Sequence, residues 1–352
     1  MEKKNTQQEI EEEIKSKGKD NIIKKIFSWI LKNVKFLLIP ASRLEELSIR
    51  QIEYEKKISK RKFIRRMKST LTIFGMLLIF FIVTIAVFAP WFSPYTFDVL
   101  VGIAPGNYDP PSPAHLLGQG RLGRDILGRI IYGARASLTI ALPSILFSLI
   151  FGVIFGVIAG FYGGWADSII MRIMDILLAF PGLILAMVFI AMWGQHMEYI
   201  MLAYGIIGVP YYSRLIRSSV VQSRDLPYVQ AAKVTGAGNW RIMFKHILPN
   251  CIQPVIISFT FDIGGIILSL AGLAFLGFSD PQLIEWGNDI ADARLHLYEA
   301  PWGAFWPGFM ILLAVLGFML LGDGLRDALD PRLRNIYGAK KKKKKKGKKR
   351  GK

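Results

Sequence analysis

Few side chains of this chain have the types and spacing needed for covalent or metal chemistry. A single cysteine, Cys251, excludes an intramolecular disulfide and any multi-cysteine zinc site. The four histidines stand far apart in the sequence, at His115, His196, His246 and His296. This separation argues against a histidine metal cluster. The sequence also contains no G-x-x-x-x-G-K-[ST] segment, so we expect no phosphate-binding loop, and no ATP binding or hydrolysis by this chain.

One acid stands out because it lies inside an apolar stretch. Asp262, near the middle of residues 251–278, is the only acid deep in such a stretch. An ionisable group at that depth is a functional-site hypothesis, so Asp262 is a candidate for a substrate path. It could meet an amino group of the substrate, or pair with a serine, a threonine or a residue of another chain. No second acid, Ser–His pair or histidine site accompanies it, which disfavours an intramembrane enzyme.

The apolar residues form blocks of about membrane-spanning length. Hydrophobic residues make up 52% of the 352 residues and charged residues only 20%, too much apolar surface for a purely soluble protein of this size. Six blocks are found, at 70–90, 136–160, 172–193, 199–213, 251–278 and 303–321. The fourth is short and contains glycine and proline. Each span must satisfy its own backbone hydrogen bonds, so six transmembrane helices are predicted and the fold class is all-α.

The distribution of Lys and Arg predicts the orientation. The segments 1–69, 161–175, 214–250 and 322–352 carry 19, one, six and 14 of these residues, and the alternate segments carry five in all. By the positive-inside rule, both termini are expected to face the cytoplasm. The few outer arginines include Arg124, Arg129 and Arg135, which could pair with Asp125 or with lipid headgroups.

The two ends of the chain are basic and lie outside the six spans. Residues 21–39 mix apolar side chains with four lysines, which predicts an amphipathic helix on the inner leaflet; a seventh span is the alternative. Seven consecutive lysines, 340–346, predict a disordered tail drawn to anionic lipids. Nothing aromatic or structured in the tail supports specific nucleic-acid binding. The predicted domains are a basic extension (1–69), a six-span domain (70–335) and the tail (336–352).

Within the spans, three residue patterns carry structural predictions. Pro181 should kink the third span. Arg172 and Asp175 are three residues apart and could pair near the inner interface. Gly264, Gly265 and Gly272 are expected to allow close helix packing.

The most informative segment is the inner loop, residues 214–250. Asp225 and Pro227 are a plausible cap and first-turn proline for a helix over LPYVQAAKV, which Gly236 and Gly238 should end. Asn239 can cap a second short helix, which Pro249 should stop. Ala231 and Ala232 would leave a flat face for another protein. Buried anchors of that contact could come from Tyr228, Val229, Trp240 and Phe244.

The inner loop resembles the EAA loop of permease subunits of bacterial ABC importers, whose pattern is E-A-A-x3-G-x9-I-x-L-P. In QAAKVTGAGNWRIMFKHILP, the matching residues are Ala231, Ala232, Gly236, Leu248 and Pro249, whereas Gln230 replaces the acid and His246 stands at the Ile position. The segments LGQGRLGRDILGRIIYGARASL, GFYGGWADSIIMRIMDILLAFPGLILAM, LAFLGFSDPQLIEWG and GDGLRDALDPRLR are similar to the dipeptide/oligopeptide C-type subfamily, in order, over about residues 70–335. Leu270 occupies a position where that subfamily usually has Glu.

The resemblance implies a bacterial inner-membrane protein of the ABC importer type I permease fold. It implies that this chain forms half of a translocation path with a B-type permease subunit, and that ABC ATPase subunits and an extracytoplasmic peptide-binding protein complete the importer. The ATPase-coupling residues would be Tyr228, Gln230, Ala231, Ala232, Gly236, Trp240, Leu248 and Pro249. No cofactor is implied in this chain, since partner subunits bind the ATP.

Other functions remain open at this point. Related permeases carry nickel or oligosaccharides, so the substrate does not follow from the motifs. An unrelated secondary transporter should show intramembrane ion sites and internal repeats, neither of which is evident here. A structural or scaffolding protein would not need the inner loop.

Overall fold

The computed structural model describes residues 63–329, which are helical and contain no β-strand within that range. Only one isolated bridge, between Gln119 and Asp125, has strand-like pairing. These residues belong to a compact unit that begins at Arg65. The amphipathic helix predicted over 21–39 and the lysine tail lie outside the described residues, so both stay predictions.

The long helices coincide with the predicted apolar blocks. They are α3 (Thr70–Val87), α6 (Ile126–Tyr162), α7 (Gly164–Leu178), α8 (Gly182–Trp193), α9 (Met197–Ser223), α13 (Gln253–Phe275) and α15 (Trp302–Leu329). Within the described residues, α3, α6, α13 and α15 are long and apolar enough to cross a membrane, and α7 with α8 make a fifth candidate if the pair is one span. The fourth predicted span lies in α9. This helix is long enough to cross a membrane, but it is less apolar than the helices named above. The sixth span therefore stays a prediction.

Pro181 marks a sharp break in the third predicted span. It lies between α7 and α8, whose axes are bent by 86°. Proline has no backbone N–H and its ring clashes with the preceding helical turn, so the helix restarts beyond it. The predicted kink at Pro181 is confirmed, and it separates the segment into two helices.

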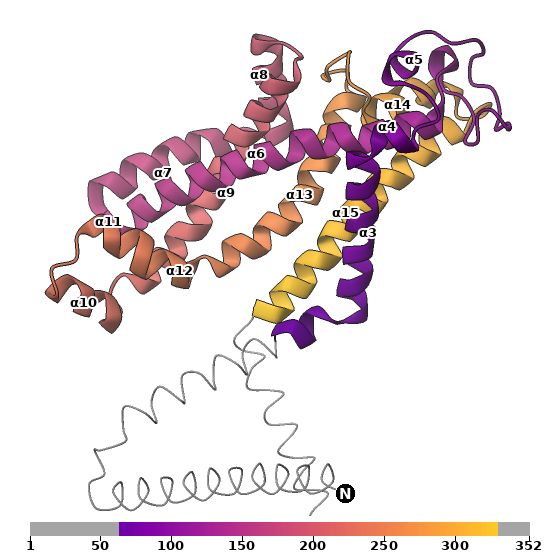
Figure 1. Cartoon of the computed structure of the whole chain (residues 1–352). Helices are drawn as coiled ribbons and strands as arrows, with labels where there is room; N and C mark the ends of the chain where they lie inside the picture. Colours follow the sequence, from indigo (N-terminus) through magenta and orange to yellow (C-terminus); the bar gives the residue numbers. More distant parts are fainter. Residues whose placement is uncertain (1–62, 330–352) are drawn as a thin grey trace, which may run out of the picture. The chain divides into compact units, whose positions relative to one another are not determined.

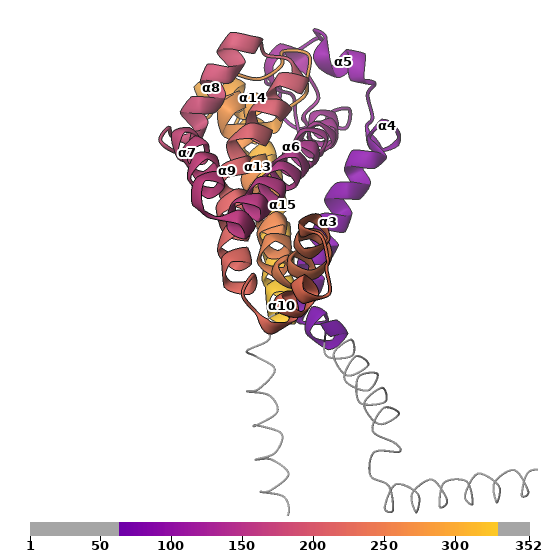
Figure 2. The ribbon, with the colours of Figure 1, turned by 90° about the vertical axis from the view of Figure 1, so that its left-hand side faces the viewer.

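Short helices gather at the two ends of this bundle. The first group is α4 (Ala89–Phe92), α5 (Phe97–Val101), η2 (Arg121–Gly123), α14 (Trp286–Ala293) and η4 (Arg294–His296), which we call the outer cap. The second group belongs to the inner loop: α10 (Pro227–Val234), α11 (Asn239–Arg241), the π-helical segment η3 (Ile242–Ile247) and α12 (Leu248–Cys251). Figures 1 and 2 place α10 at the end where α3 begins and α15 ends, and α5 and α14 at the opposite end.

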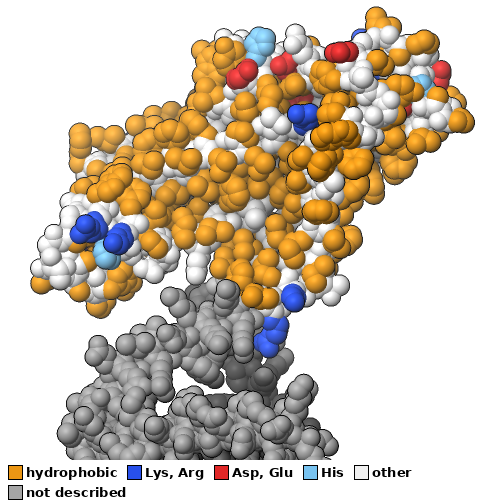
Figure 3. Space-filling view, in the orientation of Figure 1, with side chains coloured by type: hydrophobic (Ala, Val, Ile, Leu, Met, Phe, Trp, Pro, Cys, Tyr) orange, Lys and Arg blue, Asp and Glu red, His pale blue; other side chains and the backbone are white. Residues whose placement is uncertain are grey.

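The surface between the two ends is apolar. Figure 3 shows hydrophobic side chains covering the flank of the bundle, with the visible acidic side chains at the end of the outer cap. Basic side chains appear near the inner loop and near the start of α3. Exposed large hydrophobic residues such as Leu77, Phe80, Leu268 and Leu312 would be costly in water, so this flank fits lipid or a partner subunit.

Helix α6 packs closely against α9 through three glycines four residues apart. A Cβ added to Gly152, Gly156 or Gly160 would lie 2.4, 2.3 or 2.9 Å from the nearest atom of α9. Small residues at this spacing let two backbones approach, which is the main source of packing energy between helices in a membrane. The G-x-x-x-G-x-x-x-G pattern is visible in the sequence and predicts this contact, but our prediction named other glycines.

The glycines predicted to give close packing on α13 do so only in part. Gly264 lies against Val315 of α15, where a Cβ would be 3.3 Å from its Cα. A Cβ on Gly272 would make an ordinary contact of 3.8 Å, and one on Gly265 would meet nothing within 4 Å among the described residues. Close packing is therefore confirmed for Gly264 and wrong for Gly265 within this part of the chain.

Gly156→Ala should destabilise the bundle, although alanine is intrinsically the better helix former by about 1 kcal/mol. The new methyl group would lie 2.3 Å from the Ser213 carbonyl oxygen and from the Ile216 side chain, so α6 and α9 must separate. Thermal unfolding in detergent should show a lower midpoint than the parent chain. Gly265→Ala is the matched control, and an equal midpoint for both variants would contradict the packing argument.

Candidate functional site

The first arm of the inner loop is α10, which is fixed to the end of α6. Val229 and Ala232 face the main apolar core and are almost completely buried. The Lys233 amino group lies 5.9 Å from the centre of the Phe161 ring at the end of α6. Two of the predicted contact residues therefore hold the loop to its own chain. The predicted flat face of Ala231 and Ala232 is wrong for Ala232, and Val229 is not a free anchor.

Other side chains of the inner loop point away from the chain. Val234 is 88% exposed, Trp240 65% and Tyr228 37%. Gln230, Ala231 and Pro249 are also exposed, and Leu248 is half-buried. Large apolar side chains left in water outside the membrane spans are typical of a surface that another protein covers. Tyr228, Val234 and Trp240 therefore form the exposed apolar surface of the inner loop.

A glycine turn joins α10 to the second arm. Gly236 has a backbone φ of +77°, the left-handed region that glycine adopts without strain. Its N–H donates to the Lys233 carbonyl at 3.0 Å, and the Ala237 N–H donates to the Ala232 carbonyl at 3.1 Å. This pair of bonds is a Schellman cap, which ends α10 and turns the chain toward α11. The predicted break at Gly236 is confirmed.

The helix boundaries of the inner loop differ from their prediction. The helix cap positions are Leu226 for α10 and Gly238 for α11, so Asp225 and Asn239 are not the caps. Pro249 does not stop the second helix, which continues through α12 to Cys251. The π-helical turn η3 directly precedes this proline. Pro249 has no N–H and so cannot donate the usual helical hydrogen bond. The wider π-helical turn accommodates this missing bond.

The aromatic residues of the second arm lie side by side. The ring centres of Trp240 and Phe244 are 4.2 Å apart. Below them, Ile242, Met243 and Ile247 are buried in the core. The arm is thus anchored along one face and presents the Trp240 ring on the other. Trp240 is exposed and its contact with another protein stays a prediction, whereas Phe244 is partly buried beside it.

Ion pairs connect α9 to both ends of α7. Arg217 donates through two nitrogens to the carboxylate of Asp167, and Arg214 donates to Asp175. The predicted pair between Arg172 and Asp175 is therefore wrong, because the tertiary fold brings Arg214 to Asp175. A bidentate arginine–carboxylate contact fixes the orientation of the two side chains as well as their distance. The helix that leads into the inner loop is therefore tied to α7.

Asp262 has a partner within the chain. The Tyr212 hydroxyl of α9 donates to its carboxylate at 2.6 Å. Within the described part of this chain the partner is a tyrosine and not a serine or a threonine, and a contact with a residue of another chain stays a prediction. This bond connects α13 to α9 at the level of the spans. A substrate role for Asp262 stays a prediction.

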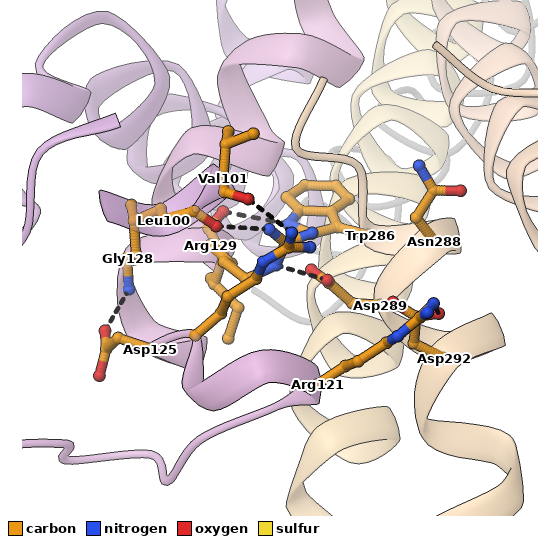
Figure 4. Close-up of polar contacts among 12 residues, drawn as sticks. Leu100, Val101, Arg121, Asp125, Gly128, Arg129, Trp286, Asn288, Asp289 and Asp292 are labelled. Carbon is orange, nitrogen blue, oxygen red and sulfur yellow. Dashed lines mark hydrogen bonds and ion pairs between the residues drawn. The ribbon is translucent and has the colours of Figure 1, made fainter. Parts of the chain in front are cut away.

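Buried charges hold the outer cap together, as Figure 4 shows. Nε of Arg129 lies 2.6 Å from Oδ1 of Asp289, and Nη1 donates to the Leu100 carbonyl at 2.9 Å. Both charged side chains are largely buried, with exposed fractions of 7% and 13%. Arg124 donates to the carbonyls of Val101 and Gly102. The predicted pairing of these arginines with Asp125 or lipid headgroups is wrong for Arg124 and Arg129, whereas Arg135 is exposed on α6.

Asp125 has a different function in the cap. Its carboxylate accepts the Gly128 N–H at 2.7 Å and so caps the start of α6. The other oxygen lies 3.0 Å from Nδ1 of His115. The fully buried Trp286 donates its indole N–H to the Ile130 carbonyl at 3.0 Å. These contacts fix α14 against the outer end of α6.

Among the acids of the outer segment 279–302, two are buried without an arginine partner. Glu285 is 4% exposed and Asp280 is 8% exposed. Burial, together with the neighbouring carboxylates of Asp280 and Asp289, raises the pKa of Glu285 to about 7. The segment is therefore less of a solvated acidic surface than its composition indicates.

The raised pKa of Glu285 predicts a pH dependence of stability. Between its ordinary pKa of 4.5 and about 7, the folded chain holds a proton that the unfolded chain has lost. The free energy of unfolding should fall as pH rises through this window and level off above it, by roughly 3 kcal/mol in total. Thermal unfolding in detergent from pH 4.5 to 8 measures this change. Glu285→Gln should flatten the profile, and an unchanged slope in this variant would contradict the assignment.

The outer arrangement could not be found from local sequence patterns. Arg129 and Asp289 are 160 positions apart, and the segments containing them meet only through the packing of α6 with α14. Among the described residues, no three His, Cys, Asp or Glu side chains are grouped so that they could hold a metal ion.

Comparison with known proteins identifies the same segments. Residues 152–335 match the family model for binding-protein-dependent transport system inner membrane components. Residues 61–111 match the N-terminal transmembrane domain of oligopeptide transport permease C.

Three curated relatives extend the similarity over about three quarters of the chain. A dipeptide transport system permease protein of Alkalihalophilus pseudofirmus is 41% identical over 270 residues, 76% of this chain and 88% of that protein. A glutathione transport system permease protein of Pectobacterium atrosepticum is 40% identical, covering 78% and 92%. A di/tripeptide transport system permease protein of Pseudomonas aeruginosa is 43% identical, covering 74% and 88%. With its helical membrane fold and its exposed inner loop, this chain belongs to the family of inner membrane permease components of binding-protein-dependent ABC transport systems.

Proposed function

We propose that this chain is the C-type permease subunit of an ATP-driven importer of dipeptides and oligopeptides. It forms half of the translocation path, and a B-type permease subunit forms the other half. The observation that carries the substrate class is the set of relatives at 40–43% identity, whose names specify dipeptides, di/tripeptides and the tripeptide glutathione. Permeases for nickel or oligosaccharides are the alternative within the subfamily.

The inner loop is the proposed contact with an ABC ATPase subunit. Tyr228, Val234 and Trp240 present apolar surface, and Gln230 and Ala231 lie exposed beside them. Val229 and Ala232 anchor the same loop to the bundle, so a displacement of its exposed face is transmitted to α6 and α9. Closure of the ATPases on ATP would move the spans in this way. ATP is bound by those partner subunits, and this chain carries no catalytic step.

The proposed orientation follows the charge distribution. Both termini and the inner loop face the cytoplasm, and the outer cap faces the compartment where an extracytoplasmic peptide-binding protein delivers substrate. The placement of the inner loop and the outer cap at opposite ends of the bundle supports this orientation. The basic terminal segments would lie against anionic lipids of the bacterial inner membrane. The proposed domains are 1–69, 70–335 and 336–352.

Transport by the reconstituted importer tests this function. The chain, its B-type partner, the ATPases and the binding protein are placed in proteoliposomes with ATP, and uptake of labelled Ala-Ala and of a tetrapeptide is measured. We expect ATP-dependent accumulation of peptide, with no accumulation of Ni²⁺ or of an oligosaccharide. Accumulation of either of these instead of peptide would overturn the proposed substrate class.

A further inference from the structure

The outer cap has an open cavity that most of the outer arginines line. It has a volume of about 500 Å³, within the range of roughly 300–1,000 Å³ that is usual for small-molecule sites. The predicted outer segments contain five arginines and no lysine, and four of the five line this one cavity. These are Arg121, Arg124, Arg129 and Arg294. They come from positions up to 173 apart, so only the fold gathers them.

The carboxylates around the cavity do not neutralise these arginines. Arg121 pairs with Asp292 at 2.9 Å, and Arg129 pairs with Asp289. Arg124 bonds only to backbone carbonyls, and Arg294 lies over the Phe275 ring at 5.4 Å. The lining itself holds four guanidinium groups and one carboxylate, that of Asp292, and the neighbouring Asp280 and Asp289 add carboxylates outside the lining. Burial and the neighbouring Arg129 lower the pKa of Arg124, as expected when positive charge is crowded together.

The arginines also retain unused hydrogen-bond donors. Each guanidinium has five N–H groups in a planar fork that fits a carboxylate. Arg124 uses Nε and Nη2, and Arg129 uses Nε and Nη1, which leaves further N–H groups on each. Ser279, Asn288 and Gln195 add neutral polar groups to the lining. Figure 4 shows Arg121, Arg129, Asn288 and Asp292 around this region.

We propose that this outer cavity binds the free carboxylate of a small peptide on its way into the translocation path. The inference rests on the proposed function, because it assigns the charged end of the substrate to a place on the chain. The cavity adjoins the end of α13, the helix that also carries Asp262, through Phe275, Leu276 and Gly277. Every peptide with an unmodified C-terminus carries this group, so the site recognises peptides without selecting a sequence. A carboxylate is the shared chemistry, and it could also come from an acidic side chain of the binding protein.

A measurement of peptide binding to the permease complex, without binding protein, distinguishes the peptide carboxylate from an acidic side chain of the binding protein. The complex of this chain with its partner subunits is placed in nanodiscs of phosphatidylcholine, without binding protein and without anionic lipid. Equilibrium dialysis then compares labelled Ala-Ala with its C-terminal amide. We expect the amide to bind about tenfold more weakly, since it loses charge-assisted hydrogen bonds to arginine. Equal binding of the two probes, or no binding of Ala-Ala, would overturn the inference.

Two variants and one control assign the effect to the cavity. Arg294→Gln changes an exposed side chain without a carboxylate partner among the described residues, so folding should be preserved. It should weaken Ala-Ala binding about fivefold to tenfold and leave binding of the amide unchanged. Arg124→Gln should do the same, provided its unfolding midpoint is that of the parent. Arg135→Gln, the outer arginine away from the cavity, should bind both probes like the parent.

Three other results have distinct meanings. If Arg294→Gln binds Ala-Ala normally but loses stimulation of the ATPase by the binding protein, the cavity takes an acid of that protein and the inference is overturned. If the parent importer accumulates peptide but Ala-Ala binding does not respond to the cavity variants, only the inference fails. If the parent importer accumulates no peptide at all, the proposed function itself fails.

Discussion

Replacing Trp240 by alanine should reduce ATP-driven uptake at least tenfold while leaving the chain folded and inserted. The indole is 65% exposed, lies at a tilt beside the Phe244 ring, and is held on an arm whose other face is buried in the core. Truncation of a central interface tryptophan typically weakens binding by about 2 kcal/mol or more, or roughly 30-fold. Because the exposed side of the ring has few contacts in this chain, the loss should fall on ATPase docking and not on folding.

The measurement is uptake in proteoliposomes together with co-purification of the ATPase. Trp165→Ala is the matched control, since this tryptophan is 81% exposed at the start of α7 and lies outside the inner loop. It should transport and co-purify like the parent. Normal uptake by Trp240→Ala, or an equal loss in both variants, would count against the coupling role of the inner loop.

Arg129→Gln should destabilise the outer cap by about 3–5 kcal/mol. The change leaves the carboxylate of Asp289, which is only 13% exposed, without its cationic partner. Removing one member of a buried ion pair has a cost of this size because the remaining charge is no longer compensated. It also removes the bond from Nη1 to the Leu100 carbonyl, which connects α5 to α6.

Thermal unfolding followed by tryptophan fluorescence measures this effect, with Trp286 buried beside the pair. Arg121→Gln is the control, because the Arg121–Asp292 pair is 60% and 30% exposed and such surface pairs contribute about 0–1 kcal/mol. The loss in Arg129→Gln should shrink at low pH, where Asp289 can take up a proton. Equal midpoints for the two variants would show that burial of the pair contributes nothing.

Local sequence patterns predicted the helices and the inner loop because these features depend on residues that are close together in the chain. An apolar block of about 20 residues must form a helix in lipid, and the α3, α6, α13 and α15 segments were found in this way. Gly236 was identified because it allows a backbone angle that other residues rarely adopt. The helix caps were missed, since Leu226 and Gly238 occupy those positions and make no side-chain bond there.

The partners of charged side chains were predicted poorly because the sequence alone does not show which residues of other helices lie nearby. Asp175 pairs with Arg214 and not with Arg172, and Asp262 pairs with Tyr212. In each case the partner comes from another helix, whose rotation and depth are set by packing along its whole length. The close contact of α6 with α9 at Gly156 is one example of packing that sets the rotation and depth of a helix. The G-x-x-x-G-x-x-x-G pattern in the sequence predicts this contact.

The sequence alone determined that the chain is a helical membrane protein with a bent loop that resembles an ABC coupling loop, and its basic segments predict which side faces the cytoplasm. Hydrophobic length, charge bias and glycine geometry are local properties, and each can be read from a short stretch of residues. Only the tertiary structure decided which loop residues are exposed, and it alone gathered four distant arginines around one cavity in the outer cap. Burial and charge neutralisation depend on groups from several helices at once, so no single stretch of the sequence contains them.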